Sequence, residues 1–350
     1  MTAPASRRLP ILALCALVAA FAAVPAPGAT RTGPRGAGPA PETEFHARDR
    51  AAAPEAKEPW HLFGAPAEDT AAAQMARARR LEAAGRRSAA RKAYDALVHN
   101  WGASPEASGA QLAVARLFEE GGDRESAFRE YQYWIERYAA TAPVPGASHE
   151  SAVAAQFALA NALCSELGGG PLSPSVEMVA SMYRHVVANA PESPRAAEAV
   201  LAEGACYESD GAWAKAVAAY EKLPSKYPSS ALVADARYRA AGCRYRLSRR
   251  QPNDEATLRH ALEALRLALR TDPSHPGAAE ARSRADELAA RQTRMAFERA
   301  EFYDRVRRDP EAALLAYGEF LRQFPNAAEA PGVRDRVAAL RASGAGSAAE

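Results

Sequence analysis

Residues 196–230 carry apolar positions at the spacing of two short amphipathic helices. The first helix has Gly204 and Tyr207 three residues apart, so both are expected on one face. The second has Ala216 and Tyr220 four residues apart on its inner face. A small residue lets a neighbouring helix approach, and an aromatic ring fills the space beside it. Because such a hairpin cannot bury its apolar face alone, the chain is expected to contain further copies.

The same pattern recurs along the chain. With Tyr220 as the anchor, the template has alanine four residues before, an aromatic residue seven after and proline eight after, with replacements in some copies. Six anchors follow it: Tyr94, Tyr131, Tyr183, Tyr220, Leu265 and Tyr317. Glycine stands nine residues before three of them, at Gly85, Gly122 and Gly211, where the left-handed turn inside a hairpin is expected. This spacing predicts an all-α fold, an α-solenoid of about six tetratricopeptide-type helix hairpins. The alternative is an alanine-rich helical bundle without repeats.

The repeats are expected over residues 68–343, with a C-terminal capping helix from about Pro331 to Arg341 and a disordered tail at 344–350. Ser104 with Pro105 is expected to cap and open the second hairpin, and Ser193 with Pro194 the fourth. Two insertion loops are predicted, around Gly168–Pro174 and over Ser248–Asp254. Neither changes the hairpin order.

The N-terminus has the pattern of an export signal. Arg7 and Arg8 precede an apolar run over 9–24, and small residues follow at 25–29. We therefore expect a signal peptide over 1–29, then a flexible linker rich in proline and alanine over 30–67. The expected location is the periplasm.

Composition and motifs favour binding over catalysis. The 44 Lys and Arg residues nearly balance 42 Asp and Glu, leaving a net charge of +2 and no basic patch of the kind that nucleic acid requires. The seven histidines never pair at metal-ligand spacing, and the chain has no nucleophile elbow or phosphate-binding loop. We expect a protein that is not an enzyme and needs no cofactor or metal.

Three cysteines follow the signal region, at Cys164, Cys206 and Cys243. Each is expected on the first helix of its hairpin. Two interpretations remain, buried thiols that pack as small hydrophobes and a Cys206–Cys243 disulfide; the first is preferred.

First helices of stacked hairpins line the inner wall of a solenoid, so a partner groove is expected there. Met75 and Leu112 are candidate apolar sockets for a peptide, and Arg79 and Arg116 are candidates to bind a carboxylate or C-terminus. Equivalent positions on the fourth hairpin are Leu201 and Glu208. Ordinary inter-helix packing and solvated charge are the alternative for these six residues.

Residues 248–324 resemble the second half of BamD, the outer-membrane protein assembly lipoprotein family. The resemblance rests on an inserted loop followed by Ala261-Leu-Glu-Ala-Leu265, then Asp272-Pro-Ser274, a long helix ending in Ala300-Glu-Phe-Tyr303, and the Ala-Ala-Leu-x-x-Tyr-x-x-Phe-Leu pattern over 312–321. It covers roughly residues 70–340.

This resemblance implies a periplasmic scaffold at the outer membrane that docks on the periplasmic domains of a BamA-like barrel insertase and receives unfolded barrel precursors. Members of the family carry a lipid on a cysteine after a Leu-Ala-Gly-like box. Here the bulky Leu14 precedes Cys15, so signal cleavage near Ala26 or Ala29 is favoured over lipidation. The alternative function is a free periplasmic adaptor, similar to the Tol-Pal coordinators of envelope synthesis. Residues 30–60 lack the heptads of a trimerisation coil, which favours the assembly scaffold.

Overall fold

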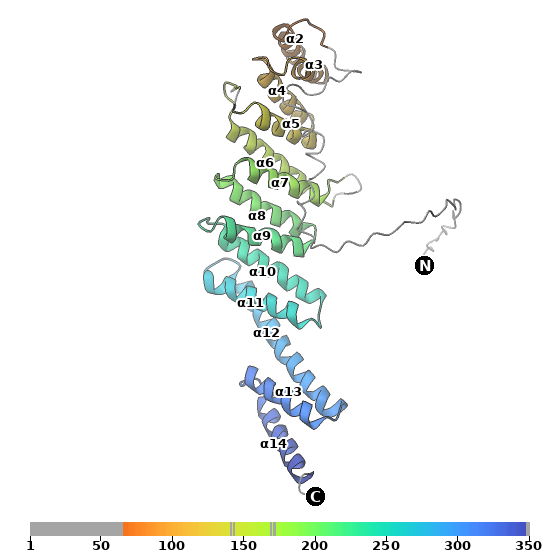
Figure 1. Cartoon of the computed structure of the whole chain (residues 1–350), viewed down its shortest axis with the longest axis vertical. Coiled ribbons are helices and arrows are strands. Elements are labelled where there is room, and N and C mark those ends of the chain that lie inside the picture. The colour runs from red at the N-terminus through yellow and green to blue at the C-terminus, as the bar shows by residue number, and fades with distance from the viewer. Residues whose placement is uncertain (1–65, 141, 143, 169, 171–172, 348–350) are drawn as a thin grey trace, which may run out of the picture. The chain divides into compact units, whose positions relative to one another are not determined.

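The structure, a computed structural model, describes residues 66–140, 142, 144–168, 170 and 173–347, with side chains through Ala342. The expected signal peptide and the linker up to residue 65 lie outside this range, as do residues 348–350. Within it the chain is helical and contains no strand (Figure 1). The all-α prediction is confirmed.

Neighbouring helices form hairpins with short connections, except in the third hairpin, where residues 166–175 lie between the two helices as the predicted insertion. The pairs are α2 (Ala71–Ala83) with α3 (Arg87–Asn100), α4 (Ala107–Glu120) with α5 (Arg124–Arg137), α6 (His149–Ser165) with α7 (Val176–Asn189), α8 (Pro194–Ser209) with α9 (Trp213–Lys226), and α10 (Val233–Arg250) with α11 (Glu255–Thr271). A sixth pair joins α12 (Ala278–Glu301) and the π-helical turn η1 (Phe302–Val306) to α13 (Pro310–Gln323), and α14 (Ala330–Ser347) follows. Each helix packs on the next, so the predicted solenoid of about six hairpins is confirmed.

Local sequence explains where several helices begin. Ser193 Oγ accepts a hydrogen bond from the Arg195 amide at 3.3 Å and Pro194 opens α8, as predicted. The corresponding prediction for Ser104 was wrong. Residues 101–106 form hydrogen-bonded turns and α4 starts only at Ala107, so the buried Ser104 hydroxyl caps nothing.

The turns inside the hairpins use left-handed backbone. Gly85, Gly122 and Gly211 have φ of +73°, +82° and +76°, as their positions before the anchor tyrosines predict. Arg308, nine residues before Tyr317, has φ of +52° in the corresponding turn of the sixth hairpin. A side chain with a Cβ therefore occupies a position that glycine fills elsewhere.

The anchor tyrosines occupy matching places. In each of these hairpins the tyrosine lies on the second helix, and its hydroxyl donates a hydrogen bond to a polar side chain on the first helix or its end. The bonds are Tyr94 to Glu82 at 2.7 Å, Tyr131 to Glu119 at 2.9 Å, Tyr183 to Asn161 at 2.7 Å, Tyr220 to Glu208 at 2.8 Å and Tyr317 to Asp304 at 3.1 Å. A repeated contact of this kind supports repeats over an irregular bundle.

The C-terminal region departs from the regular pattern at α12. Its first half shares a hydrophobic core with α10 and α11 through Ala281, Ala285 and Leu288. Its end shares another core with α13 and α14 through Ala300.

The structure also corrects two expected boundaries: α10 continues to Arg250, so the insertion is shorter than expected, and α14 reaches Ser347, into the expected tail.

Candidate functional site

A groove of about 530 Å³ lies along the first helices of the first three hairpins. Its lining comes from α2, α4 and α6, from two anchor tyrosines on α3 and α5, and from residues 144–147 before α6. The groove therefore runs across repeats, as expected for a site that binds an extended segment.

Four of the six predicted groove residues line this cavity: Met75 and Arg79 from α2, and Leu112 and Arg116 from α4. Met75 is nearly buried, and its terminal methyl group lies close to α4 at Gly109. Leu112 is half-buried, and both arginines are exposed. The cavity thus combines an apolar floor with two guanidinium groups.

The other two predicted residues lie on α8, outside this groove. Leu201 packs against the core formed by α7 to α10. Glu208 accepts the Tyr220 hydroxyl and pairs with Arg246 at 2.5 Å. Leu201 thus contributes to packing between helices, and Glu208 makes polar contacts with neighbouring helices.

Glu82 neutralises one of the two arginines that line the groove. Its carboxylate forms an ion pair with Arg116 and accepts the Tyr94 hydroxyl, so Arg116 is already compensated. Arg79 forms no ion pair with any residue that the structure describes. Within the described part of the chain, the groove therefore offers one guanidinium without an ion-pair partner, that of Arg79, beside an apolar floor. Such a pair of features suits a carboxylate next to an apolar side chain.

Sequence reasoning missed Glu82, Tyr94 and Tyr131 as groove residues, although it used the tyrosines as anchors. Burial, together with Glu82 and Glu119 at their hydroxyl groups, raises the pKa of both tyrosines, so they remain neutral donors. The available signal was an acidic residue twelve positions before three anchors, at Glu82, Glu119 and Glu208.

Other chemistry is limited in the described part of the chain. It holds no cluster of three or more His, Cys, Asp or Glu side chains suited to a metal. Cys206 and Cys243 are buried free thiols and Cys164 is a half-buried one, with Cys206 beside Cys164. None of the described helices has the length and hydropathy needed to cross a membrane.

Comparison with known proteins identifies one repeat directly. The family model of the tetratricopeptide repeat matches residues 198–230, which comprise most of α8, all of α9 and the turn after it. No curated protein sequence matches this chain.

Solved structures with a similar arrangement of helices include the following. The MamA protein is 16% identical, with 58% of this chain and 92% of that chain covered and a TM-score of 0.30. The C-terminal part of a TPR repeat-containing protein from Cytophaga hutchinsonii is 12% identical, with 76% and 88% covered and a TM-score of 0.32. The TPR2AB domain of yeast Sti1 in a complex with pHSP90 is 15% identical, with 77% and 98% covered and a TM-score of 0.23. The helix pairing of this chain, rather than these low scores, defines its fold.

The hairpin array and the matched repeat define the class of this chain: a helix-hairpin repeat protein of the tetratricopeptide type. Proteins of this architecture are scaffolds that bind other proteins on surfaces shared by several repeats.

Proposed function

We propose that this chain is an exported scaffold that holds an extended segment of another protein in the groove of α2, α4 and α6. The observation that carries the proposal is the meeting of Met75, Arg79 and Leu112 in one cavity. Met75 and Leu112 take an apolar side chain, and Arg79 takes a carboxylate or the C-terminus next to it. Arg116, held by Glu82, shapes the wall.

The cellular role that we propose is support of outer-membrane β-barrel assembly, as in the BamD family. The support for this role is the sequence resemblance over residues 248–324 together with the export signal pattern at 1–29. In this role the C-terminal hairpins contact a BamA-like insertase and the groove faces unfolded barrel precursors.

The groove is tested with an unfolded barrel protein as the probe. Arg79→Glu reverses the charge of the groove arginine that has no ion-pair partner among the described residues, and is expected to reduce crosslinking of the precursor to the full chain. Arg80→Glu, at the neighbouring exposed position of α2 but outside the groove, is the matched control and is expected to leave crosslinking unchanged. Equal crosslinking by both variants would contradict the groove assignment.

The cellular role has a separate test. The tagged full chain is purified from detergent-solubilised membranes, and recovery of a barrel insertase is the expected result. Recovery of soluble periplasmic partners alone would overturn the assembly role and favour the Tol-Pal coordinator type. Fractionation with and without residues 1–29 tests export, and loss of acyl labelling in Cys15→Ser would reverse the preference for signal cleavage.

A further inference from the structure

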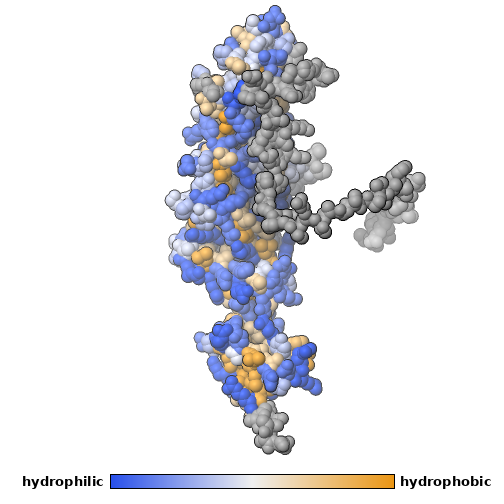
Figure 2. All heavy atoms as spheres, in the orientation of Figure 1, coloured by the Kyte–Doolittle hydropathy of each residue, from blue (hydrophilic) through white to orange (hydrophobic). Residues whose placement is uncertain are grey.

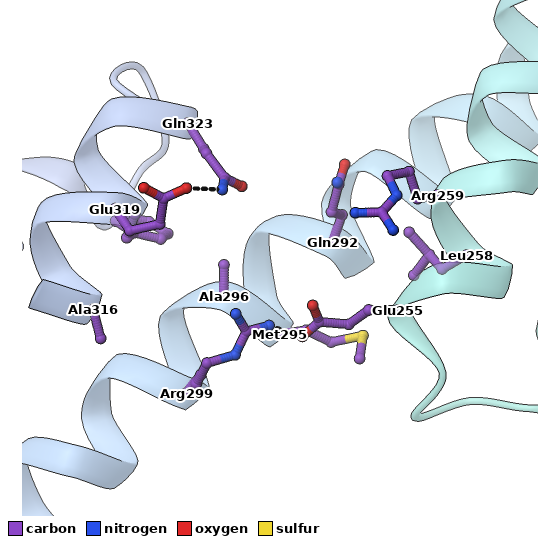
Figure 3. A pocket seen from close by; sticks show the side chains of 11 residues that line it. Glu255, Leu258, Arg259, Gln292, Met295, Ala296, Arg299, Ala316, Glu319 and Gln323 are labelled. Carbon is purple, nitrogen blue, oxygen red and sulfur yellow. Dashed lines mark hydrogen bonds and ion pairs between the residues drawn. The ribbon is translucent and has the colours of Figure 1, made fainter. Parts of the chain in front are cut away.

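A second cavity lies far along the chain from the groove, where the regular stacking changes at α12. It has a volume of about 230 Å³ and is lined by α11 on one side, α13 on the other and the middle of α12 between them (Figure 3). It separates the core that contains Leu258 from the core that contains Phe320. Met295 and Ala296 of α12 lie between these cores and provide its apolar surface.

Most charged groups on the cavity wall already have partners. Arg299 forms an ion pair with Glu255. Glu319 pairs with Arg322 and accepts a hydrogen bond from Gln323, and these partners lower the pKa of its carboxyl, which is therefore ionised at neutral pH. Both carboxylates on the cavity wall are therefore already paired with an arginine.

Arg259 and Gln292 differ from these groups. Figure 3 shows the Arg259 guanidinium and the Gln292 side chain next to each other, across the cavity from Glu319 and Gln323. Neither Arg259 nor Gln292 has an ion-pair or hydrogen-bond partner among the residues that the structure describes. Two adjacent donors without acceptors, beside a small apolar surface, match a carboxylate attached to an apolar group.

We propose that this cavity is a second protein-binding site, which accepts an acidic residue of a partner segment at Arg259 and Gln292 and an adjacent aliphatic side chain on Met295 and Ala296. The proposal does not depend on the groove of α2, α4 and α6.

The charges and the size of the cavity select this occupant. A phosphate or a nucleic-acid backbone would bring several negative charges toward Glu255 and Glu319, while Arg259 is the only lining arginine without an ion-pair partner among the described residues. A singly charged carboxylate brings less negative charge and meets less of that repulsion. The volume is below the roughly 300 Å³ at which ordinary small-molecule pockets begin, so it suits one or two side chains of a protein segment.

Helix α13 also carries exposed apolar surface. Leu315 of α13, next to the lining residue Ala316, is 77% exposed. On the face seen in Figure 2, hydrophobic residues are gathered over the α13–α14 end of the chain among hydrophilic ones. A segment anchored in the cavity can therefore extend its contact over α13.

The test is a selection of short random peptides displayed on phage. The target is the full chain carrying Arg79→Glu. This substitution weakens carboxylate binding in the groove of α2, α4 and α6, so that the selected peptides report on the second cavity. Selected peptides are synthesised, and their affinities are measured against this chain and two further variants. Arg259→Ala removes the free guanidinium, and Arg266→Ala, at another exposed arginine of α11 outside the cavity, is the matched control.

The expected peptides place Asp or Glu beside an aliphatic residue. Their affinity should fall by about tenfold, or about 1.4 kcal/mol, in Arg259→Ala and stay unchanged in Arg266→Ala. Peptides without an acidic residue, or equal binding to both variants, would overturn the proposal. Circular dichroism melting checks that the variants are folded; since both arginines are exposed, their melting is expected to match that of the target chain.

Discussion

Gly204 of α8 lies directly against the ring of Tyr220 of α9. A Cβ atom placed on Gly204 would stand 2.4 Å from Tyr220 Cδ1, closer than non-bonded atoms approach. The ring rests on the helix backbone, and its hydroxyl reaches Glu208 on the same helix. This pair explains why the repeat needs a small residue on the first helix opposite an aromatic on the second.

Gly204→Ala is expected to destabilise the protein because either the fully buried ring or the helix backbone must shift. The expected loss is about 1–3 kcal/mol of unfolding free energy, the usual cost of overpacking a core. Urea unfolding followed by circular dichroism measures it. Gly318→Ala on α13 is the matched control, since a Cβ there meets nothing within 4 Å. The control should gain about 0.5–1 kcal/mol, because alanine is favoured in a helix interior. An unchanged urea midpoint in Gly204→Ala would contradict the packing argument.

Arg308→Gly is expected to stabilise the sixth hairpin. Arg308 has φ of +52°, where the Cβ of an L-residue costs roughly 1–2 kcal/mol. Its exposed side chain forms no ion pair with a described residue, so the substitution loses no such contact. Because glycine is more flexible in the unfolded chain, the net gain should be about 1 kcal/mol.

The reciprocal change is Gly211→Ala, which puts a Cβ at φ of +76° in the turn of the fourth hairpin. It should lose about 1 kcal/mol. Urea unfolding of both variants measures these changes in the free energy of unfolding. A destabilised Arg308→Gly protein would show that the arginine side chain stabilises the fold by more than its strained backbone costs.

Cys164 is expected to be the thiol that alkylating reagents modify first. It is the most exposed of the described cysteines, and hydrogen bonding from Cys206 lowers the pKa of its thiol. Burial raises the pKa of Cys243 to about 11, so that thiol stays protonated and inaccessible. Peptide mapping after brief treatment with iodoacetamide at neutral pH measures the order. Cys206→Ala should slow the modification of Cys164 at neutral pH by removing the donor. Modification of Cys243 before Cys164 would contradict this arrangement.

The sequence predicted the hairpins well because each one repeats local signals. Gly85, Gly122 and Gly211 marked their turns, and the tyrosine anchors marked the second helices. Met75 and Leu112 could be placed in one groove because the repeat spacing alone aligns the first helices of neighbouring hairpins.

The missed features depend on packing between repeats. Glu203 is 3% exposed and pairs with Arg184 and Lys222 at 3.0 and 2.9 Å, a contact that no local pattern encodes. The cavity beside Arg259 likewise exists because α12 divides its length between two cores. The sequence of α12 contains no Gly or Pro, so its pattern does not show that the helix packs against two separate cores.

Alkaline pH is expected to destabilise the fold through the anchor tyrosines. Burial, with a hydrogen bond to Asp304, raises the pKa of Tyr317 to about 12, and burial with Glu208 nearby raises that of Tyr220 further. An unfolded tyrosine ionises near pH 10. The folded state therefore favours the protonated form of these tyrosines. Their contribution to the free energy of unfolding is fully present below about pH 10 and is lost as the pH rises toward the folded pKa values. Urea midpoints measured across this range, with tyrosinate absorbance of the folded protein, test the prediction. Tyr220→Phe should show a weaker decline of the midpoint with pH. Tyrosinate absorbance of the anchors appearing near pH 10 while the helices remain folded would contradict their burial.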